Sequence, residues 1–221
     1  MTTVNATLSF YATSVGKKTV MAVTGLLLVF FVVFHMLGNL QVYGGPEKMN
    51  GYAAFLRSIP GPLWGLRLLM LVAALLHVYT AVQLIFQGLA SRPQRYVRKR
   101  YQEATTSSRT MLVTGPLLLA YIIYHLLDQT FGVTLPGYNH DNVYGNVIRA
   151  FSNPPVAVAY IVAMLMLLLH TKHGIWSMFQ TVGLNSPRYD RTIRALSVLI
   201  TAVVVAGFVS IPVAVLAGWI R

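Results

Sequence analysis

The chain has no cysteine and few charged residues, and each shortage excludes a class of protein. Without thiolates, the chain by itself forms neither a disulfide nor an iron–sulfur cluster. Charged residues make up only 10% of the 221 residues and hydrophobic residues 56%, which is outside the range of soluble domains. The 17 basic residues outnumber the 5 acidic ones. They lie in short loops between apolar runs, which argues against nucleic acid as a partner.

Five apolar runs are long enough to cross a membrane, since about 20 helical residues span about 30 Å of hydrocarbon. The runs are too long for barrel strands, so the sequence predicts an all-α membrane protein that forms one domain over residues 1–221. No cleavable signal is evident, and the first run is long enough to remain as a span. The expected helices are Thr19–Leu40, Leu63–Ala90, Thr110–Phe131, Pro154–Thr181 and Ile193–Trp219.

The distribution of basic residues predicts the orientation, because cytoplasmic loops carry the excess of Lys and Arg. We therefore expect a cytoplasmic N-terminus and an external C-terminus. The basic loop over residues 92–109 also suits anionic lipid headgroups or an acidic partner subunit. The residues on the expected cytoplasmic side are Lys17, Lys18, Arg92, Arg95, Arg98, Lys99, Arg100, Arg109, Arg188, Arg191 and Arg194, against Lys48, Arg57, Arg149 and Arg221 outside.

A short element that ends in histidine occurs twice. Met21-Ala-Val-Thr-Gly25 is followed by His35, and Met111-Leu-Val-Thr-Gly115 is followed at the same spacing by His125. Both copies lie in apolar runs, where a histidine is costly and normally has a partner or a ligand. Two equivalent histidines on two helices can hold one metal or one haem iron between them.

Depth along the helices groups the histidines into two pairs. At 1.5 Å per residue, His35 lies about 24 Å and His125 about 22 Å from the inner helix ends, which predicts an outer pair. The inner pair joins His77 to the fourth helix, where His170 and His173 share much of one face. The Leu-Leu-His pattern favours His170 and the glycine that follows favours His173, so the residues leave this choice open. His140, in a polar outer loop, is expected to be solvated.

Two histidine pairs between helices suit b-type haem, in which iron takes one imidazole on each face. Small residues near the histidines, Gly25, Gly38, Gly115 and Gly174, would let a flat macrocycle or a neighbouring helix come close. The alternative for any single histidine is a hydrogen bond to a neighbouring helix. Zinc is disfavoured because its sites usually include cysteine or carboxylate ligands.

Three segments resemble the cytochrome b membrane subunit of succinate:quinone oxidoreductases and fumarate reductases (respiratory complex II), of the single-chain, five-helix, two-haem type. They are Ser14-Val-Gly-Lys-Lys-Thr-Val-Met-Ala-Val-Thr-Gly25, His35-Met-Leu-Gly-Asn-Leu40 and Lys172-His-Gly-Ile-Trp-Ser-Met-Phe-Gln-Thr-Val-Gly183. The resemblance covers nearly the whole chain.

The resemblance implies one axial haem ligand on each of the first four helices. His35 and His125 match the ligands of the distal haem, and His77 and His173 those of the proximal haem, with His170 as a neighbour that bonds a propionate or a carbonyl. Some fumarate reductases carry a glutamate, used for transmembrane proton movement, where this chain has Thr171. The resemblance therefore does not extend to that proton route.

The resemblance also implies the partners and the reaction. A flavoprotein subunit oxidises succinate, as in the tricarboxylic acid cycle, and an iron–sulfur subunit delivers electrons to the cytoplasmic face of this chain. Two b haems then carry them to a membrane quinone, with menaquinone favoured, in a bacterial cytoplasmic membrane. By this resemblance, the chain is expected to be a membrane anchor and electron-transfer subunit that does not itself oxidise succinate.

Polar residues near the predicted sites are candidates for propionate and quinone binding. The propionate candidates are Lys17, Lys18, Arg67, Ser108, Arg109, Lys172 and His170. An outer quinone pocket would use Asp128, Asn39, Glu47, Tyr52 and Trp64, and an inner one Ser14 and Trp176. The alternative role for the charged residues is orientation, snorkelling or partner docking, and for the aromatic residues an interfacial belt.

Two other functions are compatible with parts of the pattern. One is the membrane cytochrome b of another quinone-linked dehydrogenase, distinguished by its co-purifying subunits. The other is a haem-free proton or metal relay. Transporters often carry inverted repeats, whereas the repeat here joins two helices that run in the same direction.

Overall fold

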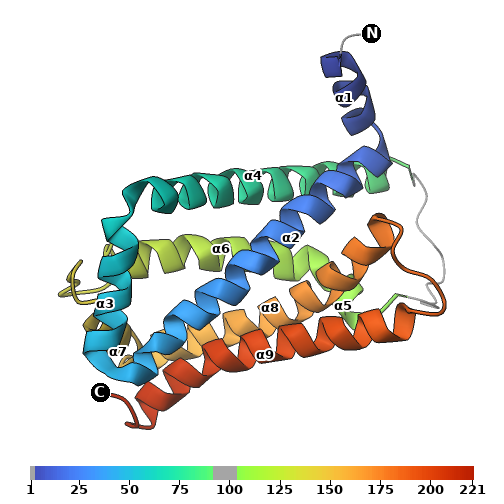
Figure 1. The fold of residues 1–221 in the computed structure, drawn as a ribbon. Coiled ribbons are helices and arrows are strands. Elements are labelled where there is room, and N and C mark those ends of the chain that lie inside the picture. The colour runs from blue at the N-terminus through green and yellow to red at the C-terminus, as the bar shows by residue number, and fades with distance from the viewer. Residues whose placement is uncertain (1–2, 92–103) are drawn as a thin grey trace.

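The computed structural model describes residues 3–91 and 104–221, and within these ranges it consists of helices and loops without strands. Ten helical elements follow one another (Figure 1). They are α1 Thr3–Ala12, α2 Ser14–Asn39, the 3-10 turn η1 Leu40–Gly44, α3 Gly45–Ser58, α4 Pro60–Ala90, α5 Thr106–Arg109, α6 Met111–Gln129, α7 Val143–Phe151, α8 Pro154–Thr181 and α9 Asp190–Leu216. The predicted all-α class is confirmed.

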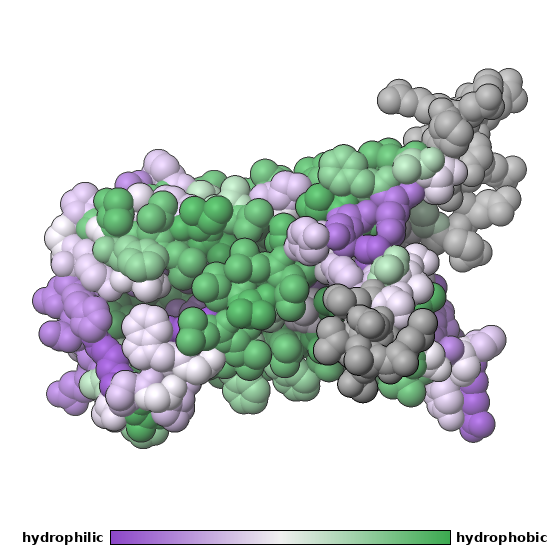
Figure 2. Space-filling view, turned by 90° about the horizontal axis from the view of Figure 1, so that it is seen from above, coloured by the Kyte–Doolittle hydropathy of each residue, from purple (hydrophilic) through white to green (hydrophobic). Residues whose placement is uncertain are grey.

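Five of these helices, α2, α4, α6, α8 and α9, are long and apolar enough to cross a membrane, as predicted. Their sides carry many exposed large hydrophobic residues, such as Phe30, Leu75 and Phe86. Figure 2 shows this apolar surface as a broad band over the middle of the molecule, with polar residues towards both ends. Because apolar side chains are stable at such a surface only in contact with lipid, the protein is a multi-pass membrane protein.

The helix ends follow local sequence signals. Thr13 caps α2 by accepting a hydrogen bond from the Gly16 amide at 3.0 Å, and prolines occupy the first turn of α4 and of α8. Gly218 follows the end of α9 with a φ of 71° and donates its amide to the Val215 carbonyl at 3.0 Å. Glycine takes this left-handed conformation with the least strain, so helix α9 ends there.

Four of the long helices form a four-cornered bundle. Helix α2 packs against α4 and α8, and α8 packs also against α6, so α2 lies diagonally across from α6 and α4 diagonally across from α8. Helix α9 covers α8 and α2 from outside (Figure 1). Neither diagonal is among the closely packed helix pairs of the described residues, so side chains from opposite corners can meet in the centre.

The bundle has two distinct ends. Helix α1 extends from one end, here called the N-end, and α3, α7 and the C-terminus lie at the other, the C-end (Figure 1). A buried cluster at the C-end joins η1, α3, α7, α8 and α9 through Val42, Met49, Phe151, Tyr160 and Ile211. This cluster ties the short helices to the bundle and fixes the level of the residues beside it.

Candidate functional site

Histidines meet across both diagonals of the bundle. His35 of α2 and His125 of α6 have ring centroids 5.8 Å apart, with ring planes at 79°. His77 of α4 and His170 of α8 have ring centroids 6.4 Å apart, at 59°. The structure therefore brings together the expected His35–His125 pair. It places His170, and not His173, opposite His77.

His173 has different surroundings. Its ring lies 6.0 Å from the Trp176 ring, one turn closer to the N-end than His170. Its Nδ1 is buried and has no hydrogen-bond partner among the described residues. The His-Gly context favoured His173, but the ring that contacts His77 is that of His170.

The repeated Thr-Gly element contacts the His77–His170 pair. Thr24 Oγ1 lies 3.2 Å from His77 Nδ1, and Thr114 Oγ1 lies 3.3 Å from His170 Nδ1. A Cβ added to Gly25 would lie 3.4 Å from His77 Cε1, so the glycine gives this ring its space. Of the other glycines singled out, Gly38 faces Tyr52 on α3 and Gly174 faces open space.

Each copy of the repeat thus spans both pairs. On α2, Thr24 contacts one pair and His35 belongs to the other, and on α6 Thr114 and His125 do the same. The histidine follows the threonine by eleven positions in each copy, which places the pairs about 16 Å apart along these helices. The repeat therefore builds two sites at once, which spacing alone did not reveal.

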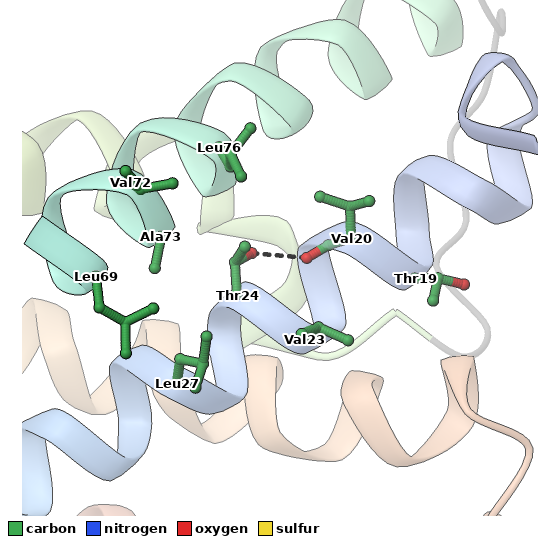
Figure 3. A pocket seen from close by; sticks show the side chains of 9 residues that line it. All are labelled: Thr19, Val20, Val23, Thr24, Leu27, Leu69, Val72, Ala73 and Leu76. Carbon is green, nitrogen blue, oxygen red and sulfur yellow. Dashed lines mark hydrogen bonds between the residues drawn. The ribbon is translucent and has the colours of Figure 1, made fainter. Parts of the chain in front are cut away.

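Hydrogen bonds determine the tautomers of three of these histidines. Thr24 donates its hydroxyl proton to the Val20 carbonyl at 2.8 Å (Figure 3), and Thr114 donates to the Thr110 carbonyl at 3.1 Å. Since each hydroxyl has one proton, these oxygens accept from the Nδ1–H of His77 and His170. Their Nε2 atoms keep the lone pair that binds a metal.

His125 is held in the same way by a different hydroxyl. Tyr160 donates its proton to Asp128 Oδ2 at 2.9 Å, and its oxygen lies 3.3 Å from His125 Nδ1. The fourth histidine, His35, stacks on Phe31 with centroids 5.2 Å apart, and Asn39 Nδ2 lies 3.4 Å from its Nε2. Three of the four imidazoles are thus oriented with Nε2 available.

The side chain of Asp128, a candidate for the outer quinone pocket, is buried in the protein. It is 1% exposed and accepts hydrogen bonds from Tyr160, from Gln129 at 2.7 Å and from Thr134 at 3.1 Å. A cavity of about 220 Å³ borders it, lined also by Thr134 and Arg149. The sequence did not single out Tyr160 as a site residue. The feature that could have indicated it is a tyrosine hydroxyl within the apolar run Pro154–Thr181.

The other candidates for the outer quinone pocket lie at the C-end, apart from Asn39, which belongs to α2. Glu47, Tyr52 and Trp64 are exposed, and the Arg67 guanidinium lies over the Trp64 ring at 4.9 Å. Asn39 instead donates to the His35 carbonyl at 2.7 Å, so its amide is already engaged in α2.

The propionate candidates other than Arg67 and His170 lie towards the N-end. Lys17 is buried and donates to the Ala12 carbonyl at 3.0 Å, whereas Lys18, Arg109 and Lys172 are exposed and Ser108 is half-buried. Part of the basic loop, residues 92–103, lies outside the described residues.

A third cluster closes the N-end between α8 and α9. Asp190 accepts from Trp176 Nε1 and from Asn185 Nδ2 at 2.8 Å each, and pairs with Arg194 at 2.6 Å. The Arg194 guanidinium also lies 4.0 Å from the Trp176 ring centroid. Trp176, considered as a quinone contact, is thus engaged in joining these helices.

Comparison with known proteins identifies the family. The family model described as succinate dehydrogenase/fumarate reductase transmembrane subunit matches residues 89–211, more than half of the chain. The chain belongs to this family. This complex II cytochrome b subunit is 22% identical over 172 residues to the succinate dehydrogenase cytochrome b558 subunit of Bacillus subtilis (strain 168). That match covers 77% of this chain and 81% of the relative. No solved structure matches the chain.

Proposed function

We propose that this chain holds two b haems, one at each histidine pair, and connects an iron–sulfur partner subunit to a membrane quinone. The observation that carries the proposal is the pair of histidine contacts across the bundle diagonals, with three of the four Nδ1 atoms bonded to hydroxyl groups. Haem iron supplies one-electron chemistry when bound. The protein residues orient the ligands and separate the two sites.

The separation of the rings fits one metal ion between each pair. Two imidazoles that each bind a metal through a nitrogen about 2 Å away have ring centroids roughly 6 Å apart. The observed values are 5.8 and 6.4 Å. No group of three or more His, Cys, Asp or Glu side chains suited to a metal occurs in the described part of the chain. Two protein ligands per site favour a cofactor that supplies the remaining ligands, as haem does.

The proposal assigns His170 as the fourth-helix ligand in place of His173. His170 faces His77, and its Nδ1–H donates to the Thr114 hydroxyl oxygen. This hydrogen bond holds the His170 ring in place. His173 then has the buried, unpaired Nδ1 on the N-end side of this site. A propionate of the haem is the acceptor that this donor lacks, a role that the sequence had suggested for His170.

Haem content of single variants tests this assignment. Pyridine haemochrome and a redox titration of the detergent-purified complex should give two b haems per chain. We expect His170→Ala to lose one haem and His173→Ala to keep both. His140→Ala is the matched control, because His140 is exposed in the loop before α7. Loss of haem in His173→Ala but not in His170→Ala would reverse the assignment, and a haem-free wild type would refute the haem proposal.

The order of the two histidine sites relative to the partner subunits follows from the family and from the charge distribution. We propose a flavoprotein and an iron–sulfur subunit at the N-end, which the excess of basic residues indicates as cytoplasmic, in a bacterial cytoplasmic membrane. The His77–His170 site would then lie nearer to the iron–sulfur subunit, and the His35–His125 site nearer to the C-end. Co-purification of both subunits with the tagged chain is the direct check, and purification with subunits of another dehydrogenase would contradict it.

Menaquinone is the proposed acceptor, on the strength of the resemblance to the five-helix, two-haem type. Among the candidates, Glu47, Tyr52 and Trp64 are accessible at the C-end, whereas Asp128 and Asn39 are engaged in the protein interior. Turnover with a menaquinone analogue should exceed turnover with a ubiquinone analogue. Trp64→Ala should slow turnover with both haems retained, and unchanged turnover would remove Trp64 from the site.

A further inference from the structure

One histidine pair has a buried carboxylate behind it, whereas no carboxylate of the described residues bonds the other pair or the hydroxyl groups beside it. Asp128, Tyr160 and His125 form a continuous chain of hydrogen bonds. The Nδ1 atoms of His77 and His170 instead bond threonine hydroxyl groups. We infer that Asp128 and Tyr160 are positioning residues that make the His125 imidazole a stronger ligand than the others. This chain of bonds would lower the reduction potential at the His35–His125 site. The inference rests on the proposed two-haem function.

The direction of each hydrogen bond follows from the number of protons. The Tyr160 hydroxyl has one proton, and it lies 2.9 Å from Asp128 Oδ2, an atom that can only accept when the carboxyl group is ionised. The remaining contact of the hydroxyl oxygen, to His125 Nδ1 at 3.3 Å, therefore has the imidazole as donor. The three groups form one relay, written His125 to Tyr160 to Asp128.

The far end of the relay is held rigidly. Gln129 Nε2 and Thr134 Oγ1 donate to the two Asp128 oxygens at 2.7 and 3.1 Å, and the residue is buried. A buried carboxylate with three donors keeps one orientation, because turning it would leave polar groups unpaired. Asp128 thus fixes the direction of the Tyr160 hydroxyl.

Tyr160 is fixed by its ring as well as by its hydroxyl. The ring contacts Phe151 edge-on with centroids 4.9 Å apart and Tyr121 with centroids 5.2 Å apart. Both contacts have the T-shaped geometry that aromatic pairs prefer. Tyr160 therefore stays in place when its hydroxyl is removed, and Tyr160→Phe changes the relay without opening a cavity.

The relay affects the iron through the electron density of the imidazole. A hydrogen bond from a metal-bound imidazole to an acceptor raises the basicity of the ligand. Successive bonds in a low-dielectric interior strengthen one another, so the carboxylate makes the Tyr160 oxygen a stronger acceptor. A more basic ligand stabilises the oxidised iron over the reduced iron. The threonine oxygens at His77 and His170 have no carboxylate behind them, so that site should be reduced more easily.

The test is a redox titration of the full complex that carries Tyr160→Phe. The two haem spectra are first assigned to their sites with His125→Ala: the spectral component that this variant loses belongs to the His35–His125 site. We expect both haems to be retained and the equilibrium constant for reduction at the His35–His125 site to rise about tenfold, or about 59 mV for one electron. The His77–His170 site should not change. Asp128→Asn should shift the same site in the same direction by less, since Tyr160 keeps its hydroxyl.

Tyr121→Phe is the matched control. The Tyr121 ring packs against both His125 and Tyr160. The Tyr121 hydroxyl, however, forms no hydrogen bond to either residue in this structure. A shift in Tyr121→Phe equal to that in Tyr160→Phe would mean that general polarity sets the potential, which would overturn the relay. Two retained haems with unchanged potentials in Tyr160→Phe would also overturn it.

Loss of haem in Tyr160→Phe has a distinct meaning. If only the His35–His125 site loses haem, the orienting role is supported, and Asp128→Asn then gives the potential. If both sites lose haem equally, the relay is not local and the inference fails. Fewer than two haems in the wild-type complex would instead refute the proposed function.

Discussion

The paired threonines allow a prediction whose size follows from the structure. In Thr24→Val or Thr114→Val, a methyl group of the same shape replaces the hydroxyl that accepts from His77 or His170. In Thr114→Val the Nδ1–H of His170 then lies in the bundle without an acceptor, which costs about 1–3 kcal/mol, whereas in Thr24→Val the Met21 backbone beside His77 makes the cost smaller. If this cost falls on the bound state, haem affinity at this site decreases about 5- to 150-fold. Helix propensities of Val and Thr are close, so the helices should remain intact.

Haem retention measures this effect. The purified variants are incubated with a haem acceptor such as apomyoglobin, and the haem left on the complex is counted at intervals. Each variant should release one haem faster than the wild type and keep the other. Thr19→Val is the control on α2, because the Thr19 hydroxyl donates to the Val15 carbonyl at 3.1 Å and its side chain points away from Thr24 (Figure 3). Wild-type retention of both haems in the two variants, or faster loss from the His35–His125 site, would refute the reasoning.

Two further predictions concern stability. A Cβ at Gly207 would lie 2.6 Å from Sδ of the buried Met36, so Gly207→Ala should destabilise the α2–α9 contact by about 1–3 kcal/mol, whereas Gly88→Ala has open space. Thermal unfolding in detergent compares the two, and equal midpoints would contradict the packing argument. Asp190→Asn weakens the network of bonds at the N-end and should lower the midpoint at low salt, with the contribution from the Arg194 ion pair fading as salt is added. A midpoint equal to that of the wild type would show that this cluster is not stabilising.

Much of the fold follows from the sequence because a membrane leaves few solutions. Backbone groups in lipid must be paired internally, so each long apolar run becomes a helix of predictable length. The expected span Pro154–Thr181 coincides with α8, and Ile193–Trp219 differs from α9 by three residues at each end. Helix ends are set by caps and by interactions outside the apolar stretch. The apolar pattern therefore predicts which segments are helices more accurately than it predicts the residues at which they begin and end.

The choice between His170 and His173 needed the tertiary structure. Three residues on a helix turn the side-chain direction by about 300°, so the two histidines point only about 60° apart. A pattern of apolar residues does not resolve such a difference. The packing of α6 on α8 decides it, because Thr114 lies beside His170.

The sequence by itself determined the class of the protein, its five spans and the pairing of His35 with His125, since hydropathy and depth are properties of each helix taken alone. The tertiary structure decided that the repeat serves two sites, that Asp128 is buried, and that Tyr160 lies between Asp128 and His125. These relations join residues on different helices. They depend on how the helices are rotated and which corners they occupy, and that is set by the packing of the whole bundle.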